Sequence, residues 1–166
     1  MGAKIAELFK RISLGVYVVG VTGGGRKSAF TAAWITPVSF KPLILALSVN
    51  PHSSTYPLLE SSQVFSVNVL GQDQSELAGH FGTPGLPDKL VGIDWQSGTT
   101  GCPLLTEALA WFECEVVDSH PAGDHVIILG RVVDGLLCHP HATPLTYRDT
   151  GNMDGADKFY PSSFGG

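Results

Sequence analysis

Short apolar runs rich in β-branched residues recur along this chain, and glycine, proline or polar breaks separate them. Such runs predict β-strands. The clearest are 14–22 (LGVYVVGVT), 43–49 (LILALSV), 64–70 (VFSVNVL) and 125–137 (HVIILGRVVDGLL). Helical segments do not alternate regularly with these runs, as they would in a doubly wound parallel sheet. The pattern predicts a mainly β protein, an antiparallel barrel with a few peripheral helices.

Two further strands have less regular patterns. Residues 28–40 (SAFTAAWITPVSF) mix small, hydroxyl-bearing and β-branched residues, and they form either an ordinary edge strand or a segment whose backbone and hydroxyls face a ligand. Residues 108–118 alternate, which puts Glu113 and Glu115 on the face opposite the apolar side chains. The run 125–137 is either a strand pair or one long bent strand.

Three segments predict helices. The first has apolar residues at i, i+3, i+4 and i+7, namely Ile5, Leu8, Phe9 and Ile12. Residues 55–62 predict a short helix. Asp73 followed by Glu76 resembles a capping box and predicts a helix to about His80. Residues 83–103, rich in glycine, proline, aspartate and serine, predict a long loop.

Length and charge limit the class of protein. The 166 residues fit one domain, 1–166, with a sizeable core. Only 15% of the residues are charged, which suggests that part of the surface is covered and that the chain self-associates. The net charge of −5 argues against nucleic acid as a partner, because phosphate backbones require clustered lysine and arginine.

The sequence predicts a cytoplasmic protein without a membrane partner. No apolar run approaches the roughly 18 residues of a spanning helix. The first helical segment is amphipathic rather than a continuous apolar signal sequence. Cys102, Cys114 and Cys138 are odd in number and not closely spaced, which favours free thiols in a reducing compartment.

The glycine-rich stretch 20–28 (GVTGGGRKS) nearly matches a phosphate-binding P-loop. Arg26 stands where the motif requires lysine, and the residues that follow are poor helix formers, although the motif needs a helix there. A hairpin turn is the better interpretation. A P-loop nucleotide binder remains a third, weaker hypothesis.

A hydroxyl cluster occupies residues 50–55 (NPHSST), between an apolar run and the predicted short helix. Hydroxyls and amides at a helix N-terminus can hold a phosphate. Serine and threonine are also the favoured N-cap residues, so ordinary capping is the alternative.

Histidines supply the remaining candidates. Asp124 and His125 lie at the start of a strand, where the pair is either a tuned acid and charge partner or part of a simple turn. Cys138, His139 and His141 lack a fourth ligand and a defining spacing, so we expect no metal site.

The order of these motifs resembles the flavin reductase-like family, the FMN-binding split barrels. The resemblance covers about 14–137, with a fainter match at 149–160. It rests on an ordered series, and no single motif carries it. The series is GVYVV, TAAWITPVSFKP, HSST, FSVNVL, PLLTEALAWFECEV and GDH. It implies an antiparallel, Greek-key split barrel and a homodimer with flavin sites near its interface.

The resemblance also implies site residues. The segment Thr31, Ala32, Ala33 and Trp34 would lie along the isoalloxazine ring, with its backbone at the pyrimidine edge, and small side chains would let a flat ring approach. The equivalents of Ser53 and Thr55 would meet the FMN phosphate. The other cofactor-binding residues expected around the end of the second apolar run are Val49, Asn50, His52 and Ser54. Many relatives have an arginine in this loop, where this chain has Pro51. Phe81 would lie near the flavin.

The implied chemistry is transfer of hydride from NADH or NADPH to FMN, with FAD as an alternative flavin. His125 would orient the nicotinamide or stabilise charge on the flavin. The second hypothesis is a non-enzymatic electron-transfer flavoprotein reduced by a protein partner such as a rubredoxin-type redox protein. Trp34 keeps that hypothesis open, because it resembles the branch of small stand-alone flavoproteins.

Overall fold

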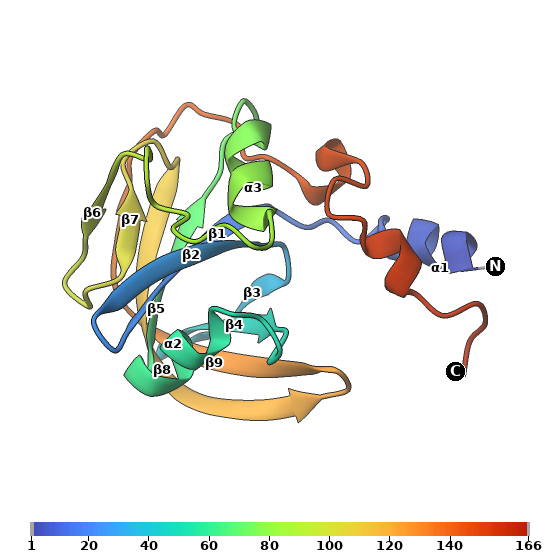
Figure 1. Ribbon diagram of the computed structural model, residues 1–166, viewed down its shortest axis with the longest axis horizontal. Helices are drawn as coiled ribbons and strands as arrows, with labels where there is room; N and C mark the ends of the chain where they lie inside the picture. The colour runs from blue at the N-terminus through green and yellow to red at the C-terminus, as the bar shows by residue number, and fades with distance from the viewer. Residues whose placement is uncertain (1, 166) are drawn as a thin grey trace.

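One antiparallel sheet of seven strands forms the body of the molecule in a computed structural model that describes residues 2–165. The spatial order is β2-β1-β5-β8-β9-β4-β3 (Figure 1). These strands are β1 (Tyr17–Gly23), β2 (Arg26–Ala32), β3 (Ile35–Phe40), β4 (Leu43–Val49), β5 (Val64–Val69), β8 (Ala110–Ala122) and β9 (His125–Leu137). The β4 to β5 connection crosses to the other half of the sheet, as Greek-key connections do.

The chain runs directly from one edge of this sheet to the other. β2 and β3 are the two edge strands, yet only Ala33 and Trp34 separate them. In a flat sheet of seven strands the edges would be roughly 29 Å apart, whereas two linking residues span about 10 Å. The sheet must therefore curl until its edges approach each other, which gives the mainly β, open barrel that the sequence predicts.

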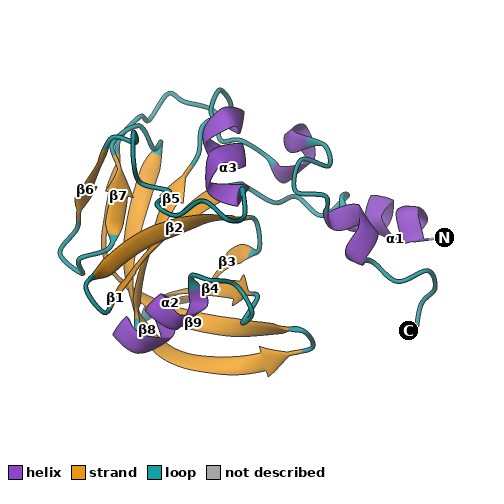
Figure 2. Ribbon diagram, in the orientation of Figure 1, coloured by secondary structure: helices purple, strands orange, loops and turns teal. Residues whose placement is uncertain are grey.

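Helices and a small hairpin surround the barrel (Figure 2). The helices are α1 (Gly2–Phe9), α2 (Tyr56–Ser62), α3 (Ser75–Gly82) and two short 3₁₀ helices, η1 (Tyr147–Thr150) and η2 (Ala156–Phe159). The hairpin is β6 (Trp95–Ser97) with β7 (Pro103–Leu105). Within residues 2–165, no helix combines the length and the apolar character needed to cross a bilayer.

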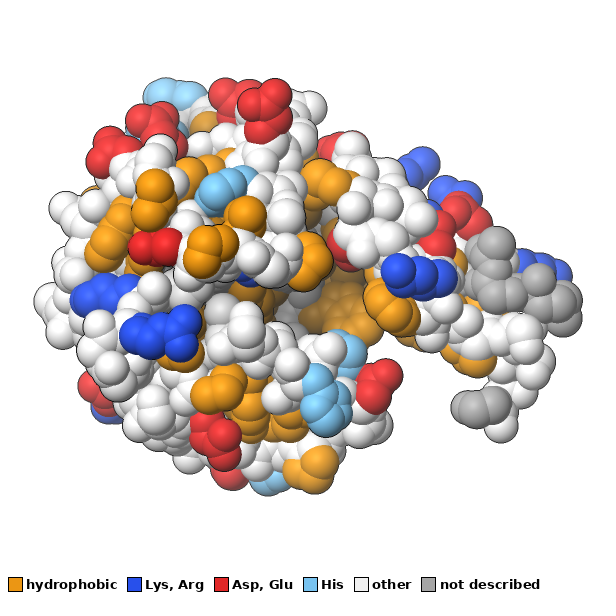
Figure 3. Space-filling model, viewed as in Figure 1, with side chains coloured by type: hydrophobic (Ala, Val, Ile, Leu, Met, Phe, Trp, Pro, Cys, Tyr) orange, Lys and Arg blue, Asp and Glu red, His pale blue; other side chains and the backbone are white. Residues whose placement is uncertain are grey.

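The first helix and the C-terminal segment form an arm beside the barrel. Lys10 Nζ lies 2.9 Å from Asp157 Oδ2, and the rings of Phe9 and Tyr160 are 5.0 Å apart. Figure 3 shows a hollow between this arm and the barrel, with apolar side chains at its floor. The arm therefore supplies one side of a concave surface.

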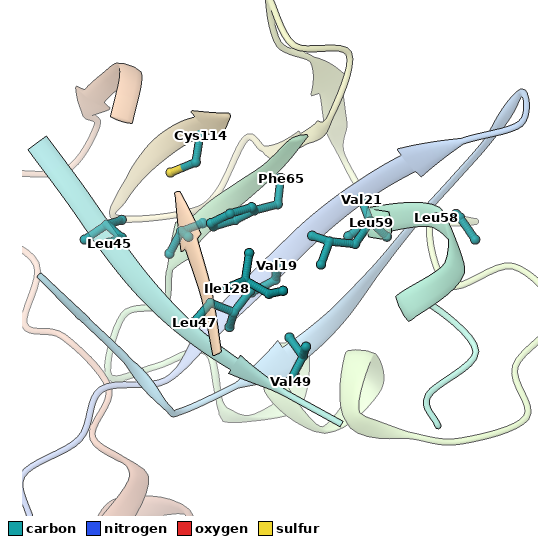
Figure 4. Close-up of a cluster of buried hydrophobic side chains, with 11 residues drawn as sticks. Val19, Val21, Leu45, Leu47, Val49, Leu58, Leu59, Phe65, Cys114 and Ile128 are labelled. Carbon is teal, nitrogen blue, oxygen red and sulfur yellow. The ribbon is translucent and has the colours of Figure 1, made fainter. Parts of the chain in front are cut away.

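Two apolar clusters lie on opposite faces of the sheet. The barrel interior contains Val19, Leu47, Phe65 and Ile128, and α2 adds Leu59 at one end (Figure 4). The second cluster lies outside the barrel, beneath α3 and the β6–β7 hairpin. It includes Val16, Val18, Leu70, Phe81 and Leu105. β1 and β5 are consequently buried on both faces.

Most sequence predictions of strands are confirmed. β4 matches the predicted run 43–49, and 125–137 is a single strand. Gly24 and Gly25, both with positive φ, form the turn between β1 and β2. This turn is the hairpin that the sequence favours over a P-loop. Strand β2, rather than a helix, follows the turn, so the P-loop hypothesis is wrong.

The predicted capping box is also wrong. α3 begins at Ser75, and its N-cap residue is Gln74, which makes no side-chain cap hydrogen bond. The Gln74 amide instead accepts from Gly71 N and donates to Glu107 O, so it joins two loops. Likewise, α1 ends at Phe9 rather than near Ile12, and the predicted loop 83–103 contains β6.

Glu113 is fully buried, unlike the exposed Glu115 on the same strand face. Its carboxylate accepts hydrogen bonds from the backbone N–H and the hydroxyl of both Thr99 and Thr100, at 2.6–3.1 Å. Burial favours the protonated acid, but these four bonds outweigh it and hold the pKa of Glu113 below its ordinary value. Glu113 therefore fixes the loop of the β6–β7 hairpin as a buried anion.

Candidate functional site

Three predicted segments meet at one end of three neighbouring strands. The Ser48 N–H donates to the Trp34 carbonyl oxygen at 3.0 Å, which places Trp34 opposite Ser48. Val49 pairs with Val126, so Asn50 and His125 follow in register. The start of β3, the end of β4 and the start of β9 thus bring together residues that lie up to 91 positions apart in sequence.

A cavity of about 500 Å³ lies beside the link between the edge strands. Its walls come from the end of β2, the C-terminal half of α3 and the tail. The lining residues include Thr31, Ala32, Ala33, Ala78, Gly79, Gly82, Thr83, Tyr147, Met153 and Asp154. Thus the cavity contains three of the predicted ring-contacting residues, and its tail wall comes from the same chain.

Small side chains face each other across this cavity. Ala32 and Ala33 lie on one wall, while Ala78, Gly79 and Gly82 lie on α3. A glycine inside a helix costs about 1 kcal/mol relative to alanine, so two of them in one eight-residue helix need a reason. Space for a flat ligand is such a reason, because each added side chain would narrow the slot.

Backbone groups are available at the same place. Ala33 and Trp34 lie outside the strands, and within residues 2–165 their N–H groups donate to no protein oxygen. A heterocycle with carbonyl oxygens and ring nitrogens could use these donors. The cavity residues therefore fit the isoalloxazine ring that the sequence resemblance implies.

Trp34 and His125 form a second group next to the cavity. Their ring centroids are 5.0 Å apart, and the rings are inclined by 45°. His125 Nδ1 lies 2.6 Å from Asp124 Oδ1. This hydrogen bond holds the pKa of the Asp124 carboxyl below its ordinary value. Trp34 is 43% exposed, so a ligand could reach the pair.

The hydroxyl cluster 50–55 does not cap α2 in the predicted way. Thr55 is the N-cap residue, but its side chain makes no cap hydrogen bond. The Ser53 and Thr55 hydroxyls are 3.3 Å apart, and Thr55 is buried. Asn50 Oδ1 accepts from His52 N at 2.9 Å and stabilises the turn. The capping alternative is therefore wrong for Thr55, while the phosphate role stays a prediction.

Other predicted site residues have their side chains elsewhere. Phe81 is fully buried in the outer cluster, and its neighbours Gly82 and Thr83 line the cavity in its place. The side chain of Val49 belongs to the barrel core, so only its backbone faces the site. Ser54 is exposed. The Phe81 side chain therefore does not line this cavity, and its position near a flavin stays a prediction.

The site residues expected from the sequence include none in the cavity wall that the tail forms. The Tyr147 hydroxyl donates a hydrogen bond to Asp154 Oδ2 at 2.8 Å. Met153 lies next to the position that a side chain at Gly79 would occupy. Burial raises the pKa of Tyr147, and the Asp154 hydrogen bond raises it further. The only signal in the sequence was the faint match of the family pattern at 149–160.

An antiparallel sheet that curls into a barrel and stays open between its edge strands β2 and β3 is a split barrel. Residues 9–156 match the family described as "Flavin reductase like domain". The chain therefore belongs to the flavin reductase-like family.

Relatives agree with this assignment. The chain is 37% identical over 137 residues to a "Probable flavin reductase" of Rhizobium meliloti, with 76% of this chain and 44% of that protein covered. It is 31% identical to the "FMN reductase (NADH) RutF" of Enterobacter cloacae, covering 84% and 85%. Its fold is similar to that of the NADH:FAD oxidoreductase SgcE6 of Streptomyces globisporus C-1027, at TM-score 0.79 and 30% identity, covering 86% of both chains.

Curated relatives differ in length. The chain spans 44% of the first Rhizobium meliloti relative and 56% of a second, the stachydrine N-demethylase reductase subunit Stc3. It spans a much larger share of the RutF relative. The shared region is thus the flavin reductase-like domain, which occurs both with and without further sequence.

Proposed function

We propose that this chain is an NAD(P)H-dependent flavin reductase that binds FMN in the slot between the β2–β3 link and α3. The proposal rests mainly on one observation: Ala32 and Ala33 line one wall of the cavity, and Gly79 and Gly82 line the opposite wall. Flat aromatic ligands fit between small side chains, and the family membership supports flavin as the ligand. Bound flavin would supply the hydride-accepting ring.

Different residues would bind the flavin ring, the phosphate and the nicotinamide. The N–H groups of Ala33 and Trp34 would bind the ring edge, and the Ser53 and Thr55 hydroxyls would hold the phosphate. Within residues 2–165 no lysine or arginine lines the cavity, so it suits the uncharged part of the flavin. His125, beside Trp34, would orient the nicotinamide. We take FMN as the proposed flavin after the name of the RutF relative, while the name of the SgcE6 relative gives FAD as the alternative flavin.

A homodimer is part of the proposal. An apolar pocket of about 390 Å³ opens between strands β3 and β4 and the strands β1, β5, β8 and β9, and residues such as Ile35, Leu43 and Val67 line it. Next to it, Phe40 is 91% exposed. Large apolar groups gathered in this way favour a covering partner. Light scattering during gel filtration should give twice the chain mass of 17.6 kDa, and a mass of one chain would contradict the dimer.

The visible spectrum of the purified protein, followed by anaerobic NADH and NADPH, tests the function. A flavin spectrum that bleaches within seconds of adding nicotinamide supports the reductase. A flavin spectrum that neither nucleotide bleaches would instead support an electron carrier reduced by a redox protein. A colourless protein that also fails to bind added FMN would overturn the flavin assignment. The cytoplasmic location stays a prediction.

A further inference from the structure

The tip of the β8–β9 hairpin carries an acid with no evident role in stability. Ala122 pairs with His125, so Gly123 and Asp124 form a two-residue turn in which Gly123 has a φ of 64°. The Asp124 side chain is 95% exposed, and the His125 side chain is 26% exposed. Exposed ion pairs contribute little to folding, yet this one is only 2.6 Å long.

The hydrogen bond determines which ring nitrogen of His125 remains available. An ionised carboxylate can only accept hydrogen bonds, so His125 Nδ1 must carry the hydrogen that it donates to Asp124 Oδ1. The hydrogen bond at one nitrogen of a histidine sets the role of the other. Nε2 is thus the nitrogen that remains for a ligand.

Trp34 also restricts the orientation of the His125 imidazole. Trp34 lies opposite Ser48, Ser48 pairs with Ile127, and His125 is two residues before Ile127 on the same strand. Alternation places these four side chains on one face of the sheet. Leu47 and Val49 point into the barrel core, so this face is the outer one. The small Ser48 leaves the space across which the indole and imidazole meet at 5.0 Å.

We propose that Asp124 and Trp34 are positioning residues that together hold the His125 imidazole with Nε2 presented to the nicotinamide. The role of His125 itself rests on the proposed function. Asp124 fixes the tautomer, and Trp34 restricts rotation of the ring. Neither residue needs to touch the reacting atoms.

The tautomer is tested first, on the flavin-free protein, by ¹⁵N NMR of the histidine rings. The wild type should show His125 protonated at Nδ1. Asp124→Asn keeps an acceptor without the charge and should keep that tautomer, whereas Asp124→Ala should shift His125 toward protonation at Nε2. A wild-type ring protonated only at Nε2, or a ring unchanged in Asp124→Ala, would overturn the proposal.

Rapid kinetics then test the consequence. Asp124→Ala and Trp34→Ala should each slow anaerobic reduction of bound flavin by NADH about tenfold, and Asp124→Ala should do so with flavin affinity and melting temperature unchanged. Asp124→Asn and Trp34→Phe should stay within about twofold of the wild type. Because both residues act through His125, adding Asp124→Ala to His125→Ala should cause no further loss.

A matched control exists on the same hairpin. Asp118 pairs with His120 Nε2 at 3.0 Å, and both side chains are exposed. Asp118→Ala should leave the reduction rate unchanged. A further tenfold loss in the double variant, or equal slowing by Asp118→Ala, would refute the positioning role. A wild type that neither NADH nor NADPH reduces would refute the proposed function instead, and the NMR result would still decide the tautomer.

Discussion

The Thr31 hydroxyl donates a 2.6 Å hydrogen bond to the carbonyl oxygen of Ala78, and this bond joins the two walls of the cavity. Thr31 lies near the end of β2, and Ala78 lies on α3. The spacing of the slot therefore depends on a contact between residues 47 positions apart. Thr31 acts as a spacer between the walls, so its hydroxyl is not free for a ligand.

Replacing this threonine should loosen the slot. Thr31→Val keeps the shape but removes the donor, which costs about 1 kcal/mol of unfolding free energy. We expect FMN affinity to fall severalfold, as measured by fluorescence titration. Thr31→Ser keeps the hydroxyl and serves as the control. Wild-type affinity in Thr31→Val would show that the bond does not set the slot.

The size of the side chain at position 79 should affect folding and FMN binding differently. A methyl group there would lie 3.4 Å from Met153 Sδ, an ordinary contact, so Gly79→Ala should fold and gain up to about 1 kcal/mol of helix stability. Gly79→Leu would extend into the cavity, and we expect FMN affinity to fall at least tenfold. Calorimetric titration checks both variants. Full affinity in Gly79→Leu would place the flavin elsewhere.

Removing the hydroxyl pair should affect only a phosphorylated flavin. Ser53→Ala combined with Thr55→Val removes both hydroxyls and keeps the buried volume of Thr55. Hydrogen bonds to a charged group contribute about 1.5–3 kcal/mol each, so FMN affinity should fall more than tenfold. Riboflavin, which lacks the phosphate, is the control ligand and should bind as before. Equal loss for both ligands would contradict a phosphate site.

Acid should destabilise the protein partly through Glu113. Because the pKa of Glu113 lies below its ordinary value, its stabilisation is present above the unfolded pKa of about 4.3 and is lost as the pH falls through the lower folded value. Glu113→Gln should lower the unfolding free energy at pH 7 by about 3 kcal/mol and flatten its dependence on pH below 5.

Denaturant unfolding at several pH values measures this effect. Glu115→Gln is the matched control, because Glu115 pairs with Arg131 in an exposed ion pair worth about 0–1 kcal/mol. The prediction fails if the two variants behave alike. A side chain added at Gly98 would collide with the Glu113 carboxylate. Gly98→Ala should therefore lower the unfolding free energy as well, which is an independent check on the role of Glu113.

Local patterns in the sequence predicted the strands and the β1–β2 turn. Alternation and β-branched runs mark 43–49 and 125–137, since each strand buries one face regardless of its partners. The glycines at 24 and 25 required positive φ, which only a tight turn uses. The small residues at 32 and 33 left an edge strand and a ligand segment as alternatives, and the ligand role stays a prediction.

The tertiary structure alone decided which segments meet. The Asp73 capping box failed because Gln74 makes long-range bonds that local rules cannot anticipate. Glu113 and Glu115 have the same local sequence pattern. Only Glu113 is covered, because the loop that joins β6 and β7 lies over it. The wall from Tyr147 to Asp154 and the tilted ring contact of Trp34 with His125 depend on the curl of the sheet. Periodicity reports how a segment is buried, but contacts between distant segments arise only when the chain closes on itself.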